Sequence, residues 1–168
     1  GRPDQGLRHL ERFVEIPGSR LSLYARLREY PRLAEYLVQV FSHSPFLTDI
    51  LVRNPEHLYW LFEETPYLSQ PLDKQTLSRQ AHQQLEAEPA PAQRLETLRR
   101  FQRRELLRIG AAQVLGLKPV AQVGRELADL ADVVIECALE ATAEELGSRY
   151  GRPRNERGQL AHFGVICL

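Results

Sequence analysis

Residues 91–116 read PAQRLETLRRFQRRELLRIGAAQVLG, and apolar side chains recur through this stretch at helical spacing. They are Leu95, Leu98, Phe101, Leu106, Ile109 and Ala112. This spacing places them on one side of an α-helix. Proline suits the first position of a helix, and glycine is the residue most often found just after its end. We therefore expect one helix from Pro91 to Gly116.

A second long helix is expected from Pro119 to Gly147. Its apolar residues are spaced alternately three and four positions apart, which is typical of a long helix packed lengthwise on others. They are Val120, Val123, Leu127, Leu130, Val134, Cys137 or Ala138, and Ala141. Only Leu117 and Lys118 separate the two helices. We therefore expect an antiparallel hairpin with arms of about 40 Å, at about 1.5 Å per residue.

Short helices are expected before the hairpin, because proline follows Tyr30, Ser44, Asn54 and Thr65. Ser, Asn and Thr cap helix N-termini, and proline suits the position that follows. The apolar residues of these helices predict a core: Leu33, Leu37, Val40, Phe41, Phe46, Leu47, Ile50, Leu51, Leu58, Tyr59, Leu61 and Phe62. Tyr59 and Trp60 leave a partner-binding patch open as the alternative. One further helix is expected between Asp73 and Leu85.

The chain divides by composition into four parts. They are a flexible N-terminal segment (1–18), a short-helix cluster (19–88), the long hairpin (89–150), and a loop with a strand (151–168). The run LAHFGVICL at 160–168 is apolar and partly β-branched, which predicts a buried strand. A lone buried strand would leave its backbone groups unpaired. We therefore expect its sheet to lie beyond Leu168, and the absence of methionine leads us to expect that Gly1 is a processed or cut end.

The overall composition narrows the class of protein. The chain has 168 residues, 43% of them apolar, with 22 basic and 22 acidic side chains. A chain of this length can bury a sizeable core, and a net charge of zero favours neither nucleic acid nor a membrane surface as partner. No apolar run approaches the ~18 residues of a membrane span. Cys137 and Cys167 are too few for a disulfide framework. We expect a soluble cytoplasmic protein.

Opposite charges gather on the two arms of the hairpin. The first arm carries Arg94, Arg99, Arg100, Arg103, Arg104 and Arg108 against two glutamates. Arg100, Arg104 and Arg108 recur every fourth residue, and such a stripe is able to hold a polyphosphate. Arg104 and Arg108 are our candidates for residues that face phosphate.

The second arm carries a row of acidic residues on one face: Asp132, Glu136, Glu140 and Glu144. Paired carboxylates are able to bind a metal, but four along one face are more typical of a solvated surface. We favour the interpretation in which the two arms attract each other across the hairpin and otherwise face water. Each exposed pair would then contribute only ~0–1 kcal/mol.

No catalytic or metal-binding motif is visible in the sequence. The histidines, His9, His43, His57, His82 and His162, do not fall at ligand spacing. Motifs such as GxSxG, HExxH and a glycine-rich phosphate loop are absent. We expect no catalytic residue, no metal ligand and no bound cofactor within this chain.

Several segments, in this order, resemble the bacterial glutamine synthetase adenylyltransferase family. They are residues 44–61, LRRFQRRELLRIGAA at 98–112, ELADLAD at 126–132, RYGRP at 149–153 and FGVICL at 163–168. The resemblance extends over about residues 20–168. Cys167 departs from the small residue that is usual at its position in the family.

The resemblance implies a bifunctional enzyme with two related nucleotidyltransferase halves. One half transfers AMP from ATP to a tyrosine hydroxyl of glutamine synthetase, and the other removes it by phosphorolysis. Both would use a polymerase-β-like sheet, on which aspartates hold Mg²⁺. In the family, the strand similar to 163–168 leads into a Gly-Lys-Leu-Gly turn and a Ser-Asp-x-Asp segment with the metal ligands. The catalytic carboxylates are therefore expected beyond Leu168.

The expected fold is mainly α: a helical bundle with a long antiparallel helix hairpin, ending in the first strand of a truncated nucleotidyltransferase α/β sheet. The resemblance implies Mg²⁺ and ATP or phosphate as cofactors of the parent enzyme, and glutamine synthetase and a PII-type nitrogen signalling protein as partners. We expect the fragment alone to be inactive. The RRELLRIG run at 103–110 favours the N-terminal, deadenylylating half.

Two other functions stay open. One is a non-catalytic helical module that docks a protein partner through the charged hairpin or the Tyr59–Trp60 region. The other is a nucleic-acid binder that uses the arginine helix, which is disfavoured because the neighbouring acidic helix would repel the phosphate backbone.

Overall fold

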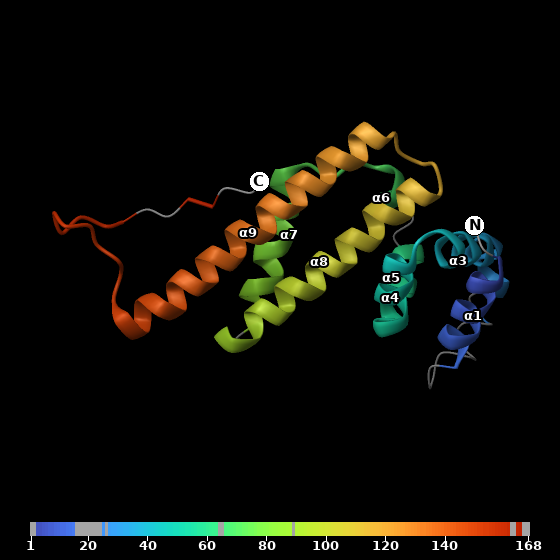
Figure 1. Ribbon diagram of the computed structural model, residues 1–168, viewed down its shortest axis with the longest axis horizontal. Helices are drawn as coiled ribbons and strands as arrows, with labels where there is room; N and C mark the ends of the chain where they lie inside the picture. Colours follow the sequence, from blue (N-terminus) through green and yellow to red (C-terminus); the bar gives the residue numbers. More distant parts are fainter. Residues whose placement is uncertain are drawn as a thin grey trace. The chain divides into compact units, whose positions relative to one another are not determined.

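The computed structural model describes residues 3–15, 25, 27–63, 66–88, 90–161 and 164–165, and most of them are helical (Figure 1). The helices are α1 (Pro3–Val14), α3 (Pro31–His43), α4 (Pro45–Arg53), α5 (Glu56–Glu63), α6 (Pro66–Ser69), α7 (Lys74–Glu86), α8 (Pro91–Val114) and α9 (Val120–Tyr150). They belong to two compact units, residues 1–71 with 103–127 and residues 72–102 with 128–168. Both α8 and α9 contribute to each unit, so the units do not follow chain order. No helix among the described residues is long and apolar enough to cross a membrane.

The first unit contains the larger hydrophobic core. Its buried residues come from α1, α3–α6 and the end of α8: Phe13, Leu33, Tyr36, Leu37, Val40, Phe41, Leu47, Ile50, Leu51, Leu58, Leu61, Leu68, Leu107 and Ala111. The helix starts that proline marks are confirmed to within one residue. At α4, the Ser44 hydroxyl accepts a hydrogen bond from the Leu47 amide at 3.2 Å, and Pro45 follows at the first helical position. The core prediction is wrong at Phe46, which is 59% exposed.

Helix α1 replaces the flexible segment expected at the N-terminus. It packs on α3 and α4, and Phe13 is 1% exposed. Gly6 faces α3, where a Cβ would lie only 2.5 Å from the Ser42 Oγ. Pro3 stands at the first position of the helix, which proline suits, and Gly6 gives the helix close contact with its neighbour.

The turn between α8 and α9 follows from Gly116. Its φ is +66°, a conformation that costs glycine nothing. The amide of Leu117 bonds to the Ala112 carbonyl, and the amide of Gly116 bonds to the Gln113 carbonyl. These two bonds satisfy carbonyls that a helix end leaves free, in the arrangement known as the Schellman motif. The prediction that α8 stops at this glycine is confirmed.

The second unit joins α7 to the first part of α8 and the larger part of α9. Helix α7 begins where the Asp73 carboxylate accepts a hydrogen bond from the Thr76 amide at 2.8 Å, as expected for a helix in this region. Its buried residues are Leu77 and Ala81.

The buried face of α9 differs from the expected one. Val123, Leu130 and Cys137 are buried as predicted, but so is Val133 rather than its neighbour Val134. Val120 and Leu127 are 71% and 40% exposed. Apolar residues occupy more than one side of α9. Spacing of three and four residues therefore picks residues from two different faces, and only one of these faces is buried.

The expected terminal strand falls largely outside the described residues, which omit 162–163 and 166–168. Leu160 forms an isolated antiparallel bridge with Arg154, and the described residues from 151 onward contain no strand. The helical part of the fold prediction is therefore confirmed, and the strand and its sheet stay predictions.

Candidate functional site

The hairpin charges include a buried ion cluster in the first unit, formed by Glu105, Arg108, Lys118 and Glu126. The Arg108 Nε donates to the Glu105 Oε2 at 2.7 Å, and its Nη2 lies 2.9 Å from the Glu126 Oε2. The Lys118 Nζ donates to the Glu126 Oε1 at 2.7 Å. None of the four side chains is more than 3% exposed. Two cations and two anions therefore balance one another inside the protein.

Lys118 ties this cluster to the segment that follows α6. Its Nζ also donates to the Gln70 carbonyl at 2.9 Å. Burial lowers the pKa of Lys118, and its hydrogen bond to Glu126 acts against this effect. Both partners of this lysine are strong acceptors. Its hydrogen bonds to them stabilise the turn between α8 and α9.

Arg108 lies inside this cluster, and its assignment as phosphate-facing stays a prediction. Its side chain is 1% exposed, and two carboxylates already surround its guanidinium group. The two carboxylates supply the opposite charge that a buried guanidinium needs, while its Nη1 has no hydrogen-bond partner among the described residues.

Arg104 has a different environment. Its guanidinium carbon lies 4.7 Å from the centroid of the Trp60 ring, and its Nη2 lies 3.2 Å from the Glu105 Oε1. The side chain keeps 22% of its surface exposed. Trp60 itself packs against the core, as the core interpretation of the aromatic residues predicts. The assignment of Arg104 as phosphate-facing stays a prediction.

The acidic row of α9 forms an ion-pair seam in the second unit. The Lys74 Nζ lies 3.1 Å from the Asp132 Oδ2 and 2.9 Å from the Glu136 Oε1. The two remaining pairs are His82 with Glu140 at 3.0 Å and Arg94 with Glu144 at 2.8 Å. The carboxylates of these pairs are 54–71% exposed and the cations 28–41% exposed. Attraction between the arms is confirmed by Arg94 and Arg108, whereas the pairing of α7 with α9 was missed.

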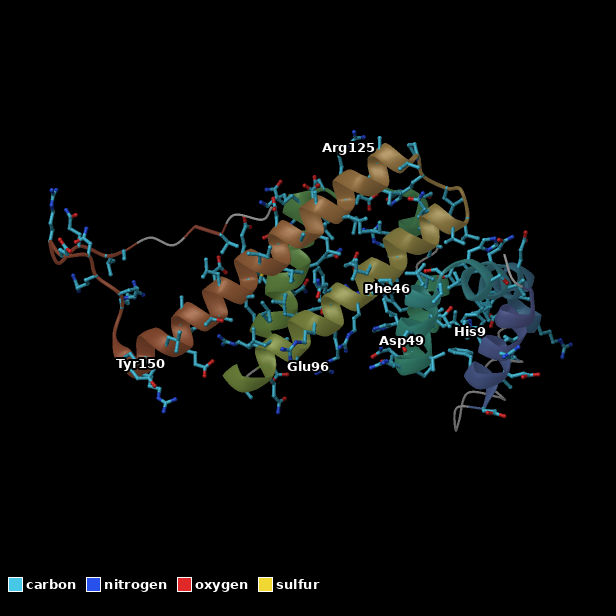
Figure 2. All side chains as sticks on the ribbon, in the orientation of Figure 1. His9, Phe46, Asp49, Glu96, Arg125 and Tyr150 are labelled. Atoms are coloured by element: carbon cyan, nitrogen blue, oxygen red, sulfur yellow. The ribbon has the colours of Figure 1, made fainter. Side chains whose placement is uncertain are left out.

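The order of these pairs gives the helix directions. Arg108 pairs with Glu126 near the turn, and Arg94 pairs with Glu144 farther along, so α8 and α9 are antiparallel, as predicted. Lys74 and His82 of α7 meet successively later residues of α9, so these two helices are parallel. Figure 2 labels Arg125 and Tyr150 near the two ends of α9, and all of the seam and cluster carboxylates of this helix lie between them in the chain.

The described residues do not fit a magnesium site. No group of three or more His, Cys, Asp or Glu side chains among them is arranged to hold a metal ion. Asp132 and Glu136 come closest in chemistry, but both face the ammonium group of Lys74. The carboxylates of the row are spread along α9 rather than directed at one point.

Comparison with known proteins gives one consistent family. The family model described as glutamate-ammonia ligase adenylyltransferase matches residues 34–168. A bifunctional glutamine synthetase adenylyltransferase/adenylyl-removing enzyme from Nitrosococcus oceani is 33% identical over 169 residues, which cover 98% of this chain and 17% of the relative.

Proteins with the same description from two other bacteria agree. The one from Thioalkalivibrio sulfidiphilus is 32% identical over 90% of this chain and 16% of its own length. The one from Brucella suis is 28% identical over 98% of this chain and 17% of its own length. The chain thus spans about a sixth of the length of these relatives. No solved structure matches it.

Proposed function

Because the chain belongs to the glutamate-ammonia ligase adenylyltransferase family, we propose that it forms a helical part of a longer enzyme that adenylylates and deadenylylates glutamine synthetase. The observation that carries this proposal is the family match over residues 34–168. The names of the relatives support it, since each describes both the transfer and the removal of the adenylyl group.

In this proposal the enzyme acts on a tyrosine hydroxyl of glutamine synthetase. The hydroxyl oxygen attacks the α-phosphorus of ATP, and pyrophosphate leaves. In the separate removal reaction inorganic phosphate attacks the same phosphorus, the bond from phosphorus to the tyrosine oxygen breaks, and the products are ADP and the free tyrosine hydroxyl. The enzyme works in the cytoplasm, and a PII-type nitrogen signalling protein is its second partner.

The chemistry is proposed to occur outside the residues described above. No three His, Cys, Asp or Glu side chains among these residues are arranged to hold a metal ion, and Arg108 pairs with Glu105 and Glu126. We therefore place Mg²⁺, ATP and phosphate in other parts of the longer protein and derive no step through them. The segment expected to lead into the catalytic sheet begins at Leu160, where the structure shows a single bridge to Arg154.

The contribution of this chain is proposed to be support. The buried cluster fixes the turn of the hairpin, and the seam holds α7 on α9. Each contact stiffens the unit to which it belongs, and sites on rigid elements keep their geometry better than sites on loops.

Activity measurements test the proposal. The longer protein that contains these residues, incubated with glutamine synthetase, ATP and Mg²⁺, should attach AMP to a tyrosine, and with phosphate it should remove it. The 168-residue chain should do neither. Mass spectrometry of glutamine synthetase detects the added AMP. A longer protein without either activity would contradict the proposal. Binding of glutamine synthetase by the inactive chain alone would favour the interaction-module alternative.

A further inference from the structure

We propose that His82 is a pH-sensitive clamp that holds α7 against α9 while its ring is protonated. The Nδ1 atom lies 2.8 Å from the Ser78 carbonyl oxygen, and the Nε2 atom lies 3.0 Å from the Glu140 Oε2. A carbonyl and an ionised carboxylate only accept hydrogen bonds. Both ring nitrogens must therefore carry hydrogen for both bonds to form, and only the imidazolium ion satisfies this requirement.

The groups that face His82 come from all three helices of the second unit. They are Ser78 and Glu86 of α7, Arg94 of α8, and Cys137, Glu140 and Glu144 of α9. Except for Ser78, these residues line with His82 a cavity of about 150 Å³. The nearby positive charge, on Arg94, is paired with Glu144 at 2.8 Å. The groups around the ring carry a net negative charge, which favours its protonated form.

The pKa of His82 changes in the direction that a clamp requires. The hydrogen bond to the Ser78 carbonyl raises it most, and the hydrogen bond to Glu140 raises it further, while desolvation acts against both. A histidine whose pKa is raised by folding stabilises the fold at pH values below its ordinary pKa. That contribution is lost as the pH rises through the raised value.

The clamp acts on the second half of α7, beyond the contact that Lys74 makes at the start of the helix. Its buried side chains are Leu77 and Ala81, and Lys74 pairs with α9 at its first turn. Lys74 keeps its charge at neutral pH, so the start of α7 stays attached. A neutral His82 has a single N–H group and keeps at most one of its two bonds. A neutral ring that keeps its Nε2–H bond to Glu140 still loses the attraction between opposite charges, so the second half of α7 is held less firmly on α9.

Cys137 reports on the state of the clamp. Its Sγ lies 3.9 Å from the His82 Nδ1, and the residue is 1% exposed. Burial raises the pKa of Cys137 to about 11, so the group is a thiol on both sides of neutral pH. Movement of the His82 side of α7 away from α9 would uncover this sulfur. Its reaction with an alkylating reagent therefore measures opening.

The first experiment follows the ring directly. In a nuclear magnetic resonance titration of the chain, Glu140→Gln should lower the pH at which His82 loses its proton, because the amide keeps an acceptor but removes the charge. Glu145→Gln changes an exposed carboxylate of the same helix and should leave the titration unchanged. An unchanged His82 titration in Glu140→Gln would overturn the proposal.

The second experiment measures alkylation of Cys137 with iodoacetamide in a Cys167→Ser background. The rate for the folded chain is divided by the rate for the urea-unfolded chain at the same pH, which removes the intrinsic effect of pH on the thiol. Between about pH 5.5 and about pH 8.5, on either side of the ordinary imidazole range, this ratio should rise by up to about fivefold, as expected for a half-exposed ion pair.

Two variants decide the result. His82→Gln should show the high ratio at both pH values. His43→Gln is the matched control, because the His43 Nδ1 makes the same 2.8 Å contact with a carbonyl four residues earlier, that of Gln39, and should behave like the native chain. A ratio that rises equally in native protein and His82→Gln, or that does not rise in native protein, would overturn the proposal. Neither readout depends on the proposed transferase function.

Discussion

Arg108 of α8 and Glu126 of α9 form an ion pair inside the protein, with the Arg108 Nη2 2.9 Å from the Glu126 Oε2 and exposures of 1% and 3%. The two atoms attract as charges, although their geometry does not make a hydrogen bond. Glu126 also accepts from Lys118, so one carboxylate contacts both buried cations, while Glu105 contacts Arg108 alone of the two. The folding of the hairpin therefore depends on this single side chain more than on any exposed pair of the seam.

The first prediction compares two carboxylates of α9 that each pair with an arginine of α8. Glu126→Gln leaves Lys118 without its carboxylate partner and Arg108 with Glu105 alone, and breaking a buried pair costs about 3–5 kcal/mol of unfolding free energy. Glu144→Gln breaks the exposed pair with Arg94, which contributes only about 0–1 kcal/mol. Urea unfolding followed by circular dichroism gives both values. Equal losses in the two variants would show that the cluster is no more important than the surface pairs.

The second prediction compares two glycines within helices. A Cβ on Gly110 would lie 2.7 and 2.9 Å from the two Cδ atoms of Leu47, and Leu47 is itself only 4% exposed. A Cβ on Gly124 would meet nothing within 4 Å. Alanine favours a helix over glycine by about 1 kcal/mol, so Gly124→Ala should stabilise the chain. Overpacking costs about 1–3 kcal/mol, so Gly110→Ala should lack that gain or reverse it.

Thermal unfolding of the two glycine variants checks this difference. Leu47→Ala makes room for the methyl group that Gly110→Ala introduces. The loss of stability caused by Leu47→Ala should therefore be smaller in the Gly110→Ala background than in the native chain. Identical shifts for Gly110→Ala and Gly124→Ala would mean that Leu47 moves aside freely.

The third prediction concerns the turn of the hairpin. Gly116 has a φ of +66° and open space around it, so a side chain there meets a conformational penalty and no clash. Gly116→Ala should cost about 1–2 kcal/mol, and Gly116→Asn should cost less because asparagine tolerates this conformation better. Denaturant midpoints measure the order of the three proteins. An alanine variant as stable as native protein would contradict the conformation assigned to this residue.

The helices could be predicted from sequence because their signals are local. A proline after a capping residue, as at Ser44 and Pro45, and a glycine stop, as at Gly116, act within a few residues of the chain. Helix α1 was not predicted because the prolines near the N-terminus were interpreted as breaking the segment, whereas Pro3 stands at the start of the helix, a position that proline suits.

The environments of the charged side chains were harder to predict, because each one depends on which residues lie opposite. Arg100, Arg104 and Arg108 have the same spacing, yet Arg100 is exposed, Arg104 lies on Trp60 and Arg108 is buried. Spacing identifies a common face of a helix but not what covers it. Lys74 and His82 lie eight residues apart on α7, which is a signal for pairing with an acidic helix, but only the structure shows which helix they meet.

The fourth prediction is a pH dependence opposite in sign to that of His82. His57 of α5 is buried, and its Nε2 has no hydrogen-bond partner among the described residues. Burial lowers the pKa of His57 most, Glu56 acts to raise it, and Arg104 and Arg103 lower it further. Protonation would place an unpaired charge beside two arginines. The stabilising contribution is therefore complete above the ordinary pKa of about 6.5 and is lost as the pH falls through the lowered value.

Urea midpoints at several pH values between about pH 5 and about pH 7, the range below and around the ordinary imidazole pKa, measure this effect. His57→Gln stays neutral throughout, so its midpoint should fall less steeply with acidification than that of native protein. His43→Gln, at an exposed histidine, should keep the native slope. His82→Gln removes a group that stabilises the fold when protonated, so its midpoint should fall more steeply on acidification. Parallel curves for native protein and His57→Gln would show that His57 finds a partner when charged. The assignment of a neutral, buried imidazole at this position would then be wrong.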